Sequence, residues 1–262
     1  MSAANRFRLP ALTPRFVPIW RRHFLVWRRF WAQNLVGNIA DPLIYLVGFG
    51  YGIGAIVPQV GNVPYINFIA AGSVCIATTY AASFEVMYSA FSRMHVQRTW
   101  DAILAAPLTL DDIVLAELVW AASKAVLSGL PILLVAGLLG LWESPLALWI
   151  ALLIPLVGLT FAALGLPFTA LAHGYEFFVY YFTLLITPMA ILCGVFFPVE
   201  QLPPTLRMIS EFLPLTHATA LARPLLLGSV PPAIAYHAAV LIAYTLAGFY
   251  LAVILFRRRL QS

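Results

Sequence analysis

Few ionisable side chains lie inside the long apolar stretches of this sequence, and these few are the first candidates for chemistry. Glu85 lies in one such stretch, while Glu117 and Lys124 lie seven residues apart in another, on one face of a predicted helix. A charge in hydrocarbon is costly, so such residues are functional candidates by default. For Glu117 and Lys124 we favour mutual neutralisation. For Glu85, which has no obvious partner nearby, a polar contact between helices and a place in a transport pathway both stay open.

Motifs for enzymatic chemistry are missing from the sequence. The one lysine, Lys124, is not preceded by a G-x-x-x-x-G-K-[ST] loop, which cradles nucleotide phosphates. No G-x-S-x-G elbow occurs. No two of the histidines have the spacing of metal ligands: His23, His95, His173, His217 and His237. We therefore expect no enzyme, no metal site and no cofactor on this chain, and any ATP and Mg²⁺ used for transport must bind a partner protein.

The amino-acid composition indicates which kind of secondary structure must position the ionisable residues. Of the 262 residues, 62% are hydrophobic and 10% are charged, and the mean hydropathy is +0.92. Soluble domains have about 45–50% apolar and about 25% charged residues, which excludes a soluble enzyme, a disordered tail and a disulfide scaffold. A membrane span takes about 20 apolar residues. The sequence therefore predicts an all-α polytopic membrane protein, with about six spans in one domain over residues 1–262.

The apolar runs place the spans along the chain. A preceding helix over residues 15–34 carries tryptophans on one face and arginines on the other, which favours a position flat in the headgroup layer. A soluble helix packed on another domain is the alternative. The six predicted spans cover residues 35–56, 65–91, 113–141, 146–171, 177–197 and 233–256.

Basic residues indicate the orientation of the spans. Seven of the 15 Lys and Arg residues precede residue 30, and Arg257, Arg258 and Arg259 end the last span. Such clusters mark the cytoplasmic side. We expect both termini in the cytoplasm, a location in the bacterial inner membrane, and no nucleic-acid partner.

Two connections are more than simple turns. The long cytoplasmic loop at residues 92–112 begins as a short amphipathic helix, which Pro107 should end. Thr109 and Asp112 then have the spacing of a capping box that opens span three. On the other side, the proline-rich segment 198–231 carries a helical apolar stripe. It predicts short external helices that dip back into the outer leaflet.

Aromatic side chains and glycines complete the set of candidate residues. Aromatic faces can stack on sugar rings or slide past acyl chains, although anchoring at the membrane surface is the more common role of a single aromatic residue. The candidates for lining a pathway are Tyr80, Phe84, Glu85, Tyr88, Phe178 and Tyr181. Overlapping small-xxx-small pairs, which let helices approach closely, are formed by Gly48, Gly50, Gly52 and Gly54.

In several of these stretches the sequence resembles the permease subunits of ABC-2 type transporters. The stretch TPMAILCGVFFPVEQLPP at 187–204, followed by PLTH at 214–217, is typical of the wider family. The narrower resemblance is to NodJ-type permeases of nodulation lipo-oligosaccharide exporters. It rests on NLVGNIADPLIYLVGFGYGIG at 34–54, RMHVQRTWDAILAAPLTLDDIVLAEL at 93–118, RPLLLG at 223–228 and RRRL at 257–260. Asp101 departs from relatives, which commonly carry glutamate there, but it keeps the charge.

The resemblance implies six spans, an interfacial helix, a cytoplasmic coupling helix and external helices before span six. It also implies a homodimer in which each permease binds one of two copies of a separate, NodI-type ATPase. The coupling loop, residues 93–108, would contact the ATPase through Arg93, His95, Arg98, Trp100, Asp101, Leu104 and Pro107. The dimer would meet at span five and at the four glycines of span one.

The leading functional hypothesis is the membrane subunit of an ATP-driven exporter of a lipo-oligosaccharide or a similar amphiphilic glycan. One alternative is an ABC-2 exporter of drugs or other lipids. Another is a channel or carrier that acts alone, but a channel should show a ring of charges or carbonyls as its filter, and no such segment is apparent.

Overall fold

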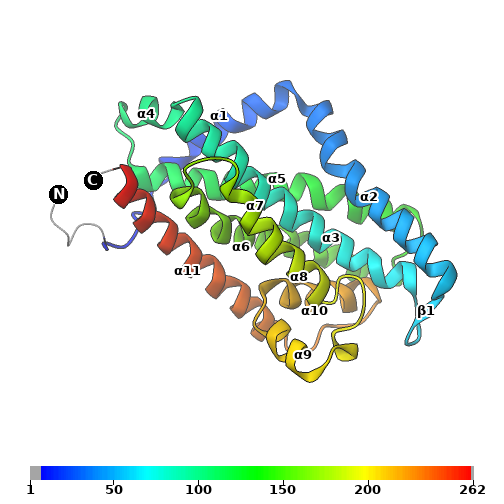
Figure 1. The fold of residues 1–262 in the computed structure, drawn as a ribbon. Coiled ribbons are helices and arrows are strands. Elements are labelled where there is room, and N and C mark those ends of the chain that lie inside the picture. Colours follow the sequence, from blue (N-terminus) through cyan, green and yellow to red (C-terminus); the bar gives the residue numbers. More distant parts are fainter. Residues whose placement is uncertain (1–6, 261–262) are drawn as a thin grey trace.

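The computed structural model describes residues 7–260, without the side chains at positions 32–35, 37–39, 41, 42 and 45. Helices dominate the fold (Figure 1). They are α1 (Phe16–Arg29), α2 (Trp31–Ile56), α3 (Tyr65–Phe84), α4 (Thr99–Leu104), α5 (Leu110–Leu138), α6 (Ile150–Leu171), α7 (Phe177–Tyr181), α8 (Thr187–Leu192), α9 (Pro204–Glu211), α10 (Pro214–Leu226) and α11 (Ile234–Leu260).

Shorter elements join or extend these helices. The strands β1 (Gln59–Val60) and β2 (Val63–Pro64) form an antiparallel hairpin in which Gln59 pairs with Pro64. Two 3₁₀ turns, η4 (Pro145–Trp149) and η6 (Val199–Gln201), precede α6 and α9. Three π-helical segments are η2 (Glu85–Ser89) and η3 (Ser92–Val96) after α3, and η5 (Phe182–Ile186) between α7 and α8. Such segments occur mostly as single turns within helices, frequently at functional sites.

Within the part of the chain that the structure describes, four helical stretches are long and apolar enough to cross a membrane. They are Tyr65–Val96, Leu110–Leu138, Pro145–Leu171 and Ile234–Leu260, which correspond to predicted spans two, three, four and six. Two shorter apolar stretches, Leu46–Ile56 and Phe177–Leu192, lie at the positions of predicted spans one and five. The all-α membrane character is therefore confirmed, whereas the count of six spans stays a prediction.

Close helix approach holds the bundle together at small residues. A Cβ added at Gly248 on α11 would lie 2.7 Å from the backbone oxygen of Ala163 on α6. A Cβ at Gly72 on α3 would lie 2.6 Å from the backbone oxygen of Val195. Any side chain at these positions would push the two backbones apart, so glycine is required there by packing, as expected for helices that associate in lipid.

The ends of α5 and α11 are joined by charge. Thr109 and Asp112 form the predicted capping box at the start of α5. The preceding residue in the same turn, Asp111, accepts hydrogen bonds from Arg257 at 2.5 Å and from the backbone N–H of Ala11 at 2.8 Å. Beside them, Arg259 donates to the backbone oxygens of the last turn of α6, where a cation also favours the helix dipole. The basic C-terminus and the N-terminal segment are thus part of the packed structure.

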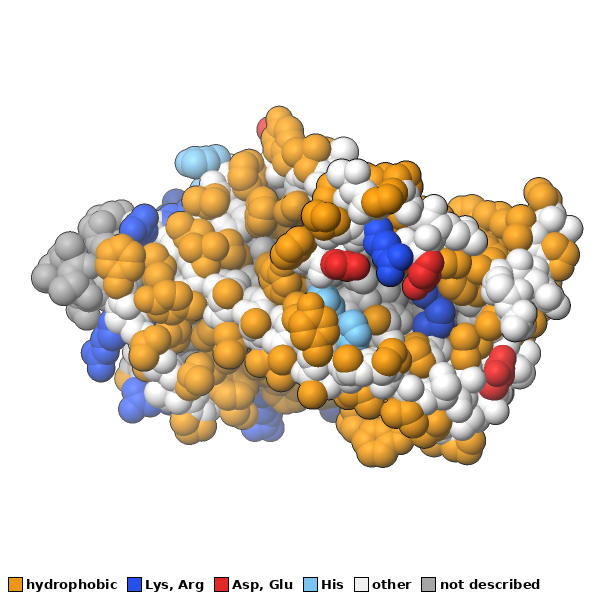
Figure 2. Space-filling model, turned by 90° about the horizontal axis from the view of Figure 1, so that it is seen from below, with side chains coloured by type: hydrophobic (Ala, Val, Ile, Leu, Met, Phe, Trp, Pro, Cys, Tyr) orange, Lys and Arg blue, Asp and Glu red, His pale blue; other side chains and the backbone are white. Residues whose placement is uncertain are grey.

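The two ends of the molecule differ in their elements. Both termini and α4 lie at one end in Figure 1, while α9 and the β1–β2 hairpin lie toward the other. Orange apolar side chains are spread across the face seen in Figure 2, as expected of a surface that meets lipid. On that face a pair of pale-blue histidines lies beside acidic and basic side chains. Helices α9 and α10 confirm that segment 198–231 is helical rather than an open loop.

Candidate functional site

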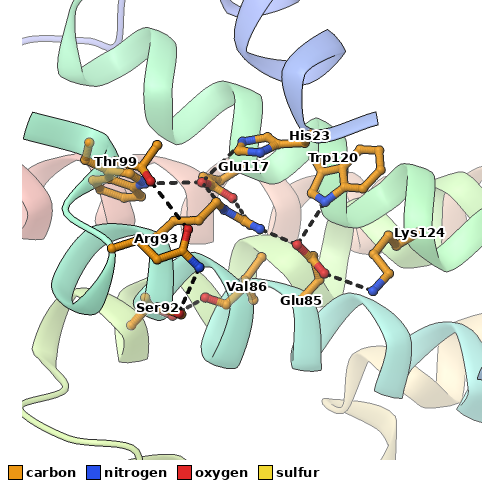
Figure 3. A network of polar contacts seen from close by, with 12 residues as sticks. His23, Glu85, Val86, Ser92, Arg93, Thr99, Glu117, Trp120 and Lys124 are labelled. Atoms are coloured by element: carbon orange, nitrogen blue, oxygen red, sulfur yellow. Dashed lines mark hydrogen bonds and ion pairs between the residues drawn. The ribbon is translucent and has the colours of Figure 1, made fainter. Parts of the chain in front are cut away.

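Five ionisable residues from four elements meet in the interior beside the end that carries α4 (Figure 3). Glu117 and Lys124 lie on α5, Glu85 on η2, Arg93 on η3 and His23 on α1. We call this group the charge network. Its members come together because Glu117 and Lys124 face one side of α5 at helical spacing, while the π-helical turns after α3 aim Glu85 and Arg93 toward that side. The carboxylates are buried, with Glu117 at 1% and Glu85 at 3% exposure.

Arg93 is the central cation of the charge network. Its Nε lies 2.9 Å from Glu117 Oε1, and its Nη2 lies 2.5 Å from Glu117 Oε2 and 2.8 Å from Glu85 Oε1. Lys124 Nζ lies 3.1 Å from the other oxygen of Glu85. Two carboxylates are therefore balanced by two cations, with a planar guanidinium where two acceptors must be held at once.

Indole N–H groups complete the hydrogen bonding of both carboxylates. Trp120 donates to Glu85 over 2.8 Å, and Trp100 donates to Glu117 over 3.2 Å. The imidazole Nε2 of His23 lies 3.5 Å from Glu117 Oε1. Buried charges are tolerated only when they are paired and hydrogen-bonded, and this group meets that condition. The network is suited to holding helices in one arrangement.

The partners of these residues differ from the sequence expectation at one point. Mutual neutralisation of Glu117 and Lys124 is wrong, because Arg93 binds Glu117 and Lys124 binds Glu85. Their spacing of seven residues places two helical turns between them. Glu85 sits in that gap from a neighbouring helix. Of the two roles left open for Glu85, the structure supports the polar contact between helices.

The coupling loop has an inner and an outer side. Trp100 on α4 is 1% exposed, and its ring centroid lies 5.0 Å from that of Phe256 on α11. Arg93 also points inward, into the charge network. The remaining predicted contact residues are exposed: His95, Arg98, Asp101, Leu104 and Pro107. The loop thus presents a mixed apolar and charged surface on one side of α4. The opposite side of α4 is held against the helix bundle by Trp100.

The backbone is strained where the chain enters α4. Arg98 has a φ of 50° and lies in the left-handed region. A non-glycine residue there costs about 1–3 kcal/mol, and such strain is found at functional sites. The sharp turn lets the π-helical end of span two and the short α4 lie at an angle, which directs Trp100 inward.

Aromatic side chains from span two and α7–η5 stack on one another. Phe84 and Phe182 have ring centroids 4.6 Å apart, and Tyr80 stacks on Phe182 at 5.8 Å with parallel planes. Tyr88 contacts Phe84 at 5.1 Å and Phe178 at 5.3 Å. We call these five residues the aromatic cluster. Phe84 is 48% exposed, so the cluster reaches the surface of this chain.

The structure divides the predicted pathway residues. Tyr80, Phe84, Tyr88 and Phe178 all belong to the aromatic cluster. Tyr181 is buried behind the cluster, with its ring centroid 5.7 Å from that of Phe182 and 4.9 Å from that of Phe168. Glu85 directly follows Phe84 but lies in the charge network. The aromatic cluster and the charge network are therefore neighbours along the same π-helical turn.

The four glycines of α2 also divide. A Cβ at Gly50 would lie 2.9 Å from Ile66 Cγ1 on α3, and one at Gly54 would lie 3.9 Å from Tyr65. These two glycines pack within the chain. Around Gly48 and Gly52 the described residues leave the space open to 4 Å, and both glycines are exposed. An exposed small-xxx-small pair therefore remains at Gly48 and Gly52.

Several residues that make these long-range contacts were not found from the sequence. His23, Trp120 and the pair formed by Asp111 and Arg257 join segments that are far apart in the chain. One local signal existed: Trp120 follows Glu117 by three residues, on the same helical face. Within residues 7–260, no three His, Cys, Asp or Glu residues gather as a metal site.

Comparisons with known proteins identify the family. The sequence profile of the ABC-2 type transporter family matches residues 15–227. Nodulation protein J of Rhizobium meliloti (strain 1021) is 45% identical over 253 residues, which cover 97% of each protein. Nodulation protein J of Bradyrhizobium diazoefficiens is 44% identical over 254 residues, or 96% of each. Nodulation protein J of Azorhizobium caulinodans is 32% identical over 180 residues, or 69% of this chain and 71% of that relative.

The family match spans most of the chain, and the identity to the Rhizobium meliloti and Bradyrhizobium diazoefficiens proteins covers 97% and 96% of it. Both agree with the membrane-spanning helices and with the helical loop between spans two and three. The chain belongs to the ABC-2 type transporter family as a permease of the NodJ type, that is, as a transmembrane subunit of an ABC transporter.

Proposed function

We propose that this permease exports a lipo-oligosaccharide or a similar amphiphilic glycan, driven by ATP that binds and is hydrolysed on a separate ATPase. The observation that carries the proposal is the two-sided α4. Trp100 fixes this short helix to α5 and α11, while Arg98, Asp101 and Leu104 stay exposed beside it. An exposed helix that is rigidly attached to the spans can transmit a displacement by a partner protein to the bundle.

The partner is a NodI-type ATPase, of which two copies bind two copies of this permease. Each ATPase supplies the ATP and Mg²⁺ site that the sequence of this chain lacks. The outer face of residues 93–108 docks on the ATPase. Closure of the two ATPases pulls the α4 helices together and shifts the charge network, which is bonded to α4 through Trp100.

The permease crosses the bacterial inner membrane six times, with both termini in the cytoplasm. The joining of the basic C-terminus, the N-terminal segment and α4 at one end of the molecule supports this orientation (Figure 1). In the dimer, span one of each copy meets span five of the other. The exposed glycines Gly48 and Gly52 suit such a contact because they allow close approach in lipid.

The aromatic cluster is proposed as part of the pathway for the cargo. Stacked rings bind the apolar faces of sugars and the methylene groups of acyl chains without a fixed set of hydrogen bonds. Phe84, which is half exposed, and the partly exposed Tyr88 are the residues placed to meet an entering molecule. An exporter of drugs or other lipids on this fold is the second candidate, because such a cluster also binds their apolar surfaces.

The test is co-expression of the chain with a NodI-type ATPase. We would measure co-purification, ATPase activity in vesicles, and ATP-dependent movement of a fluorescent lipo-oligosaccharide. The variant Arg98→Glu/Leu104→Glu changes the outer face of α4 and should reduce ATPase retention about tenfold, as expected when central interface residues are lost. The matched control, Arg207→Glu/Ile209→Glu, makes the same kind of change on exposed residues of α9 and should retain the partner.

If the α4 and α9 variants retain the ATPase equally well, the outer face of α4 is not the docking surface. Movement of the probe without ATP or an ATPase would instead favour the channel or carrier class. Export of a fluorescent phospholipid but not of the lipo-oligosaccharide would favour the second candidate. Unchanged export after replacing Phe84 and Tyr88 by Ser would show that the aromatic cluster only anchors the chain in the membrane.

A further inference from the structure

Helix α1 has an inner face that joins it to span three. Ile19 and His23 on this face are buried at 3% and 4% exposure. Trp20 donates its indole N–H to Ser123 Oγ over 3.0 Å, and His23 reaches Glu117 of the charge network at 3.5 Å. Much of the tryptophan face that the sequence placed against the headgroup layer is therefore turned toward α5.

The outer face of α1 carries an open hollow of about 480 Å³. The residues around the hollow follow one another at helical spacing along a single stripe of the helix. Aliphatic side chains and two adjacent arginines alternate along it. The lining residues are Val17, Pro18, Arg21, Arg22, Leu25 and Val26.

The hollow carries two exposed positive charges. Arg21 and Arg22 are exposed, and the structure gives neither of them an ion pair or a hydrogen bond among the described side chains. The sequence of α1, FVPIWRRHFLVWRR, holds no acidic residue. Two guanidinium groups with their fork of N–H donors suit a phosphate, which they can bind in bidentate fashion.

Apolar side chains beside the arginines indicate which kind of anion binds there. Val17, Leu25 and Val26 are 45%, 52% and 55% exposed. A soluble anion would leave this aliphatic surface in water, whereas a phospholipid covers it with acyl chain while its headgroup meets the arginines. This pattern of basic and apolar residues on one helix face is that of helices at anionic membrane surfaces.

We propose that the outer face of α1 is a binding site for an anionic phospholipid of the cytoplasmic leaflet. Arg21 and Arg22 hold the headgroup phosphate, and Val17, Leu25 and Val26 rest against the acyl chains. The site rests on the proposed orientation, in which the end with both termini faces the cytoplasm. Because the inner face of the same helix is hydrogen-bonded to Ser123 and approaches Glu117, a bound lipid also fixes α1 against the charge network.

The experiment uses the full-length permease, purified in detergent and incubated with a mixture of phosphatidylglycerol and phosphatidylcholine. Native mass spectrometry counts the lipids that each variant retains. Arg21→Gln/Arg22→Gln should lower phosphatidylglycerol retention by about 10- to 30-fold, as expected for the loss of two basic contacts to an anionic lipid. The control Arg28→Gln/Arg29→Gln removes the same charge from the same helix outside the hollow, and should lower retention less than Arg21→Gln/Arg22→Gln does.

Further measurements distinguish a lipid headgroup from free phosphate, and loss of the binding site from unfolding of the variant. Inorganic phosphate at millimolar concentration should not displace the lipid, because it lacks the acyl chains that cover the aliphatic residues. Arg21→Lys/Arg22→Lys keeps the charge and should retain more lipid than the glutamine variant. An unchanged melting temperature of the glutamine variant excludes unfolding as the cause.

Equal retention of both lipids, or equal losses in the two glutamine variants, would overturn the proposal. Displacement by phosphate alone would identify a free-anion site and overturn it as well. If the glutamine variant keeps its lipid but, in a separate co-purification, loses the ATPase or the second permease copy, the face is a protein contact and the proposal is wrong. Lipid retention is measured without the ATPase and without cargo, so its failure is distinguishable from failure of the proposed export function.

Discussion

Trp100 on α4 donates its indole N–H to Glu117 on α5 over 3.2 Å, so the short helix of the loop between spans two and three is bonded to the buried charge network. The same carboxylate receives both N–H groups of the Arg93 fork. A displacement of α4 therefore cannot occur without changing the surroundings of Glu117. This single contact connects the surface of the proposed ATPase dock with the interior of the bundle.

The first prediction concerns Trp100→Phe. The substitution keeps an aromatic ring against Phe256 but removes the N–H that Glu117 accepts. A hydrogen bond to a charged group contributes about 1.5–3 kcal/mol, so we expect a modest loss of stability and a larger loss of coupling. ATPase activity that cargo stimulates in wild-type complexes should become cargo-independent. The measurement is vesicle ATPase activity with and without lipo-oligosaccharide.

The control for that prediction is Trp149→Phe, which changes an exposed tryptophan at the end of η4. It should leave both stability and cargo stimulation at wild-type values. Cargo stimulation retained by Trp100→Phe would show that the contact between α4 and Glu117 does not transmit the signal.

The second prediction separates the members of the charge network. Glu85→Gln leaves Arg93 with one carboxylate and Lys124 without its buried partner. Breaking a buried pair on one side costs about 3–5 kcal/mol, so we expect a strong fall in folded protein extracted from the membrane. The double variant Glu85→Gln/Lys124→Met removes both charges and should recover most of that loss. Thermal unfolding monitored by fluorescence size-exclusion chromatography gives the comparison.

Recovery of stability in the double variant is the result that tests the pairing of Glu85 with Lys124. If the double variant is less stable than Glu85→Gln, Lys124 has another partner and the pairing is wrong. If stability recovers but export does not, Glu85 has a function in transport besides holding the helices. Arg207→Gln, which affects only the exposed bridge to Glu211 on α9, serves as the control for the loss of a surface charge.

The sequence predicted those features that depend on local pattern. Long apolar runs predict spans two, three, four and six because crossing hydrocarbon needs a fixed length of apolar helix. The capping box at Thr109 and Asp112 was found because its spacing is set within one turn. The pairing of Lys124 was missed because its partner Glu85 lies 39 positions earlier, on another helix. Sequence distance carries no information on which helices face each other.

The division of the glycines shows the same limit. All four have the same spacing and the same chemistry, so the pattern could not tell which pair faces the chain itself. The rotation of α2 against α3 decides it, and that rotation depends on Ile66 and Tyr65 of the next helix. The burial of Trp100 could not be predicted from the sequence either. It depends on Phe256, which lies near the end of the chain.

The third prediction uses this division to test the dimer. Gly52→Leu places a side chain in open space and should leave the stability of the single permease within about 0.5 kcal/mol, as surface substitutions usually do. If two copies meet at Gly48 and Gly52, the same change should shift the protein from dimer to monomer. Gly50→Leu, which would clash with Ile66, should instead destabilise the single chain. Crosslinking and mass photometry report the oligomer, and thermal unfolding reports the fold.

Two results would contradict that prediction. A dimer that persists in Gly52→Leu would place the interface elsewhere on the permease. A fall in stability of Gly52→Leu equal to that of Gly50→Leu would show that both glycine pairs pack inside one chain.

The fourth prediction concerns pH and the contact between α10 and α11. His217 Nε2 lies 3.1 Å from the backbone oxygen of Glu211, which can only accept, so Nε2 carries the proton in the neutral ring. The other nitrogen, Nδ1, then accepts from Nδ1 of His237 at 2.8 Å. Burial, and next the neighbouring His237, lower the pKa of His217 below its usual value. The ring of Tyr236 packs on the imidazole, and the carboxylate of Glu211 faces Arg207.

The sign of the pH effect follows from that lowered pKa. The unfolded chain, with a histidine pKa of about 6.5, binds a proton more readily than the folded one, so stability rises with pH. The contribution is present above about pH 6.5 and is lost as the pH falls below that value. We expect the melting temperature to fall between about pH 7.5 and pH 5.5, with hydrogen exchange increasing first in α10. His217→Gln/His237→Gln should weaken this dependence, and an unchanged pH profile in that variant would show that the pair does not hold α10 to α11.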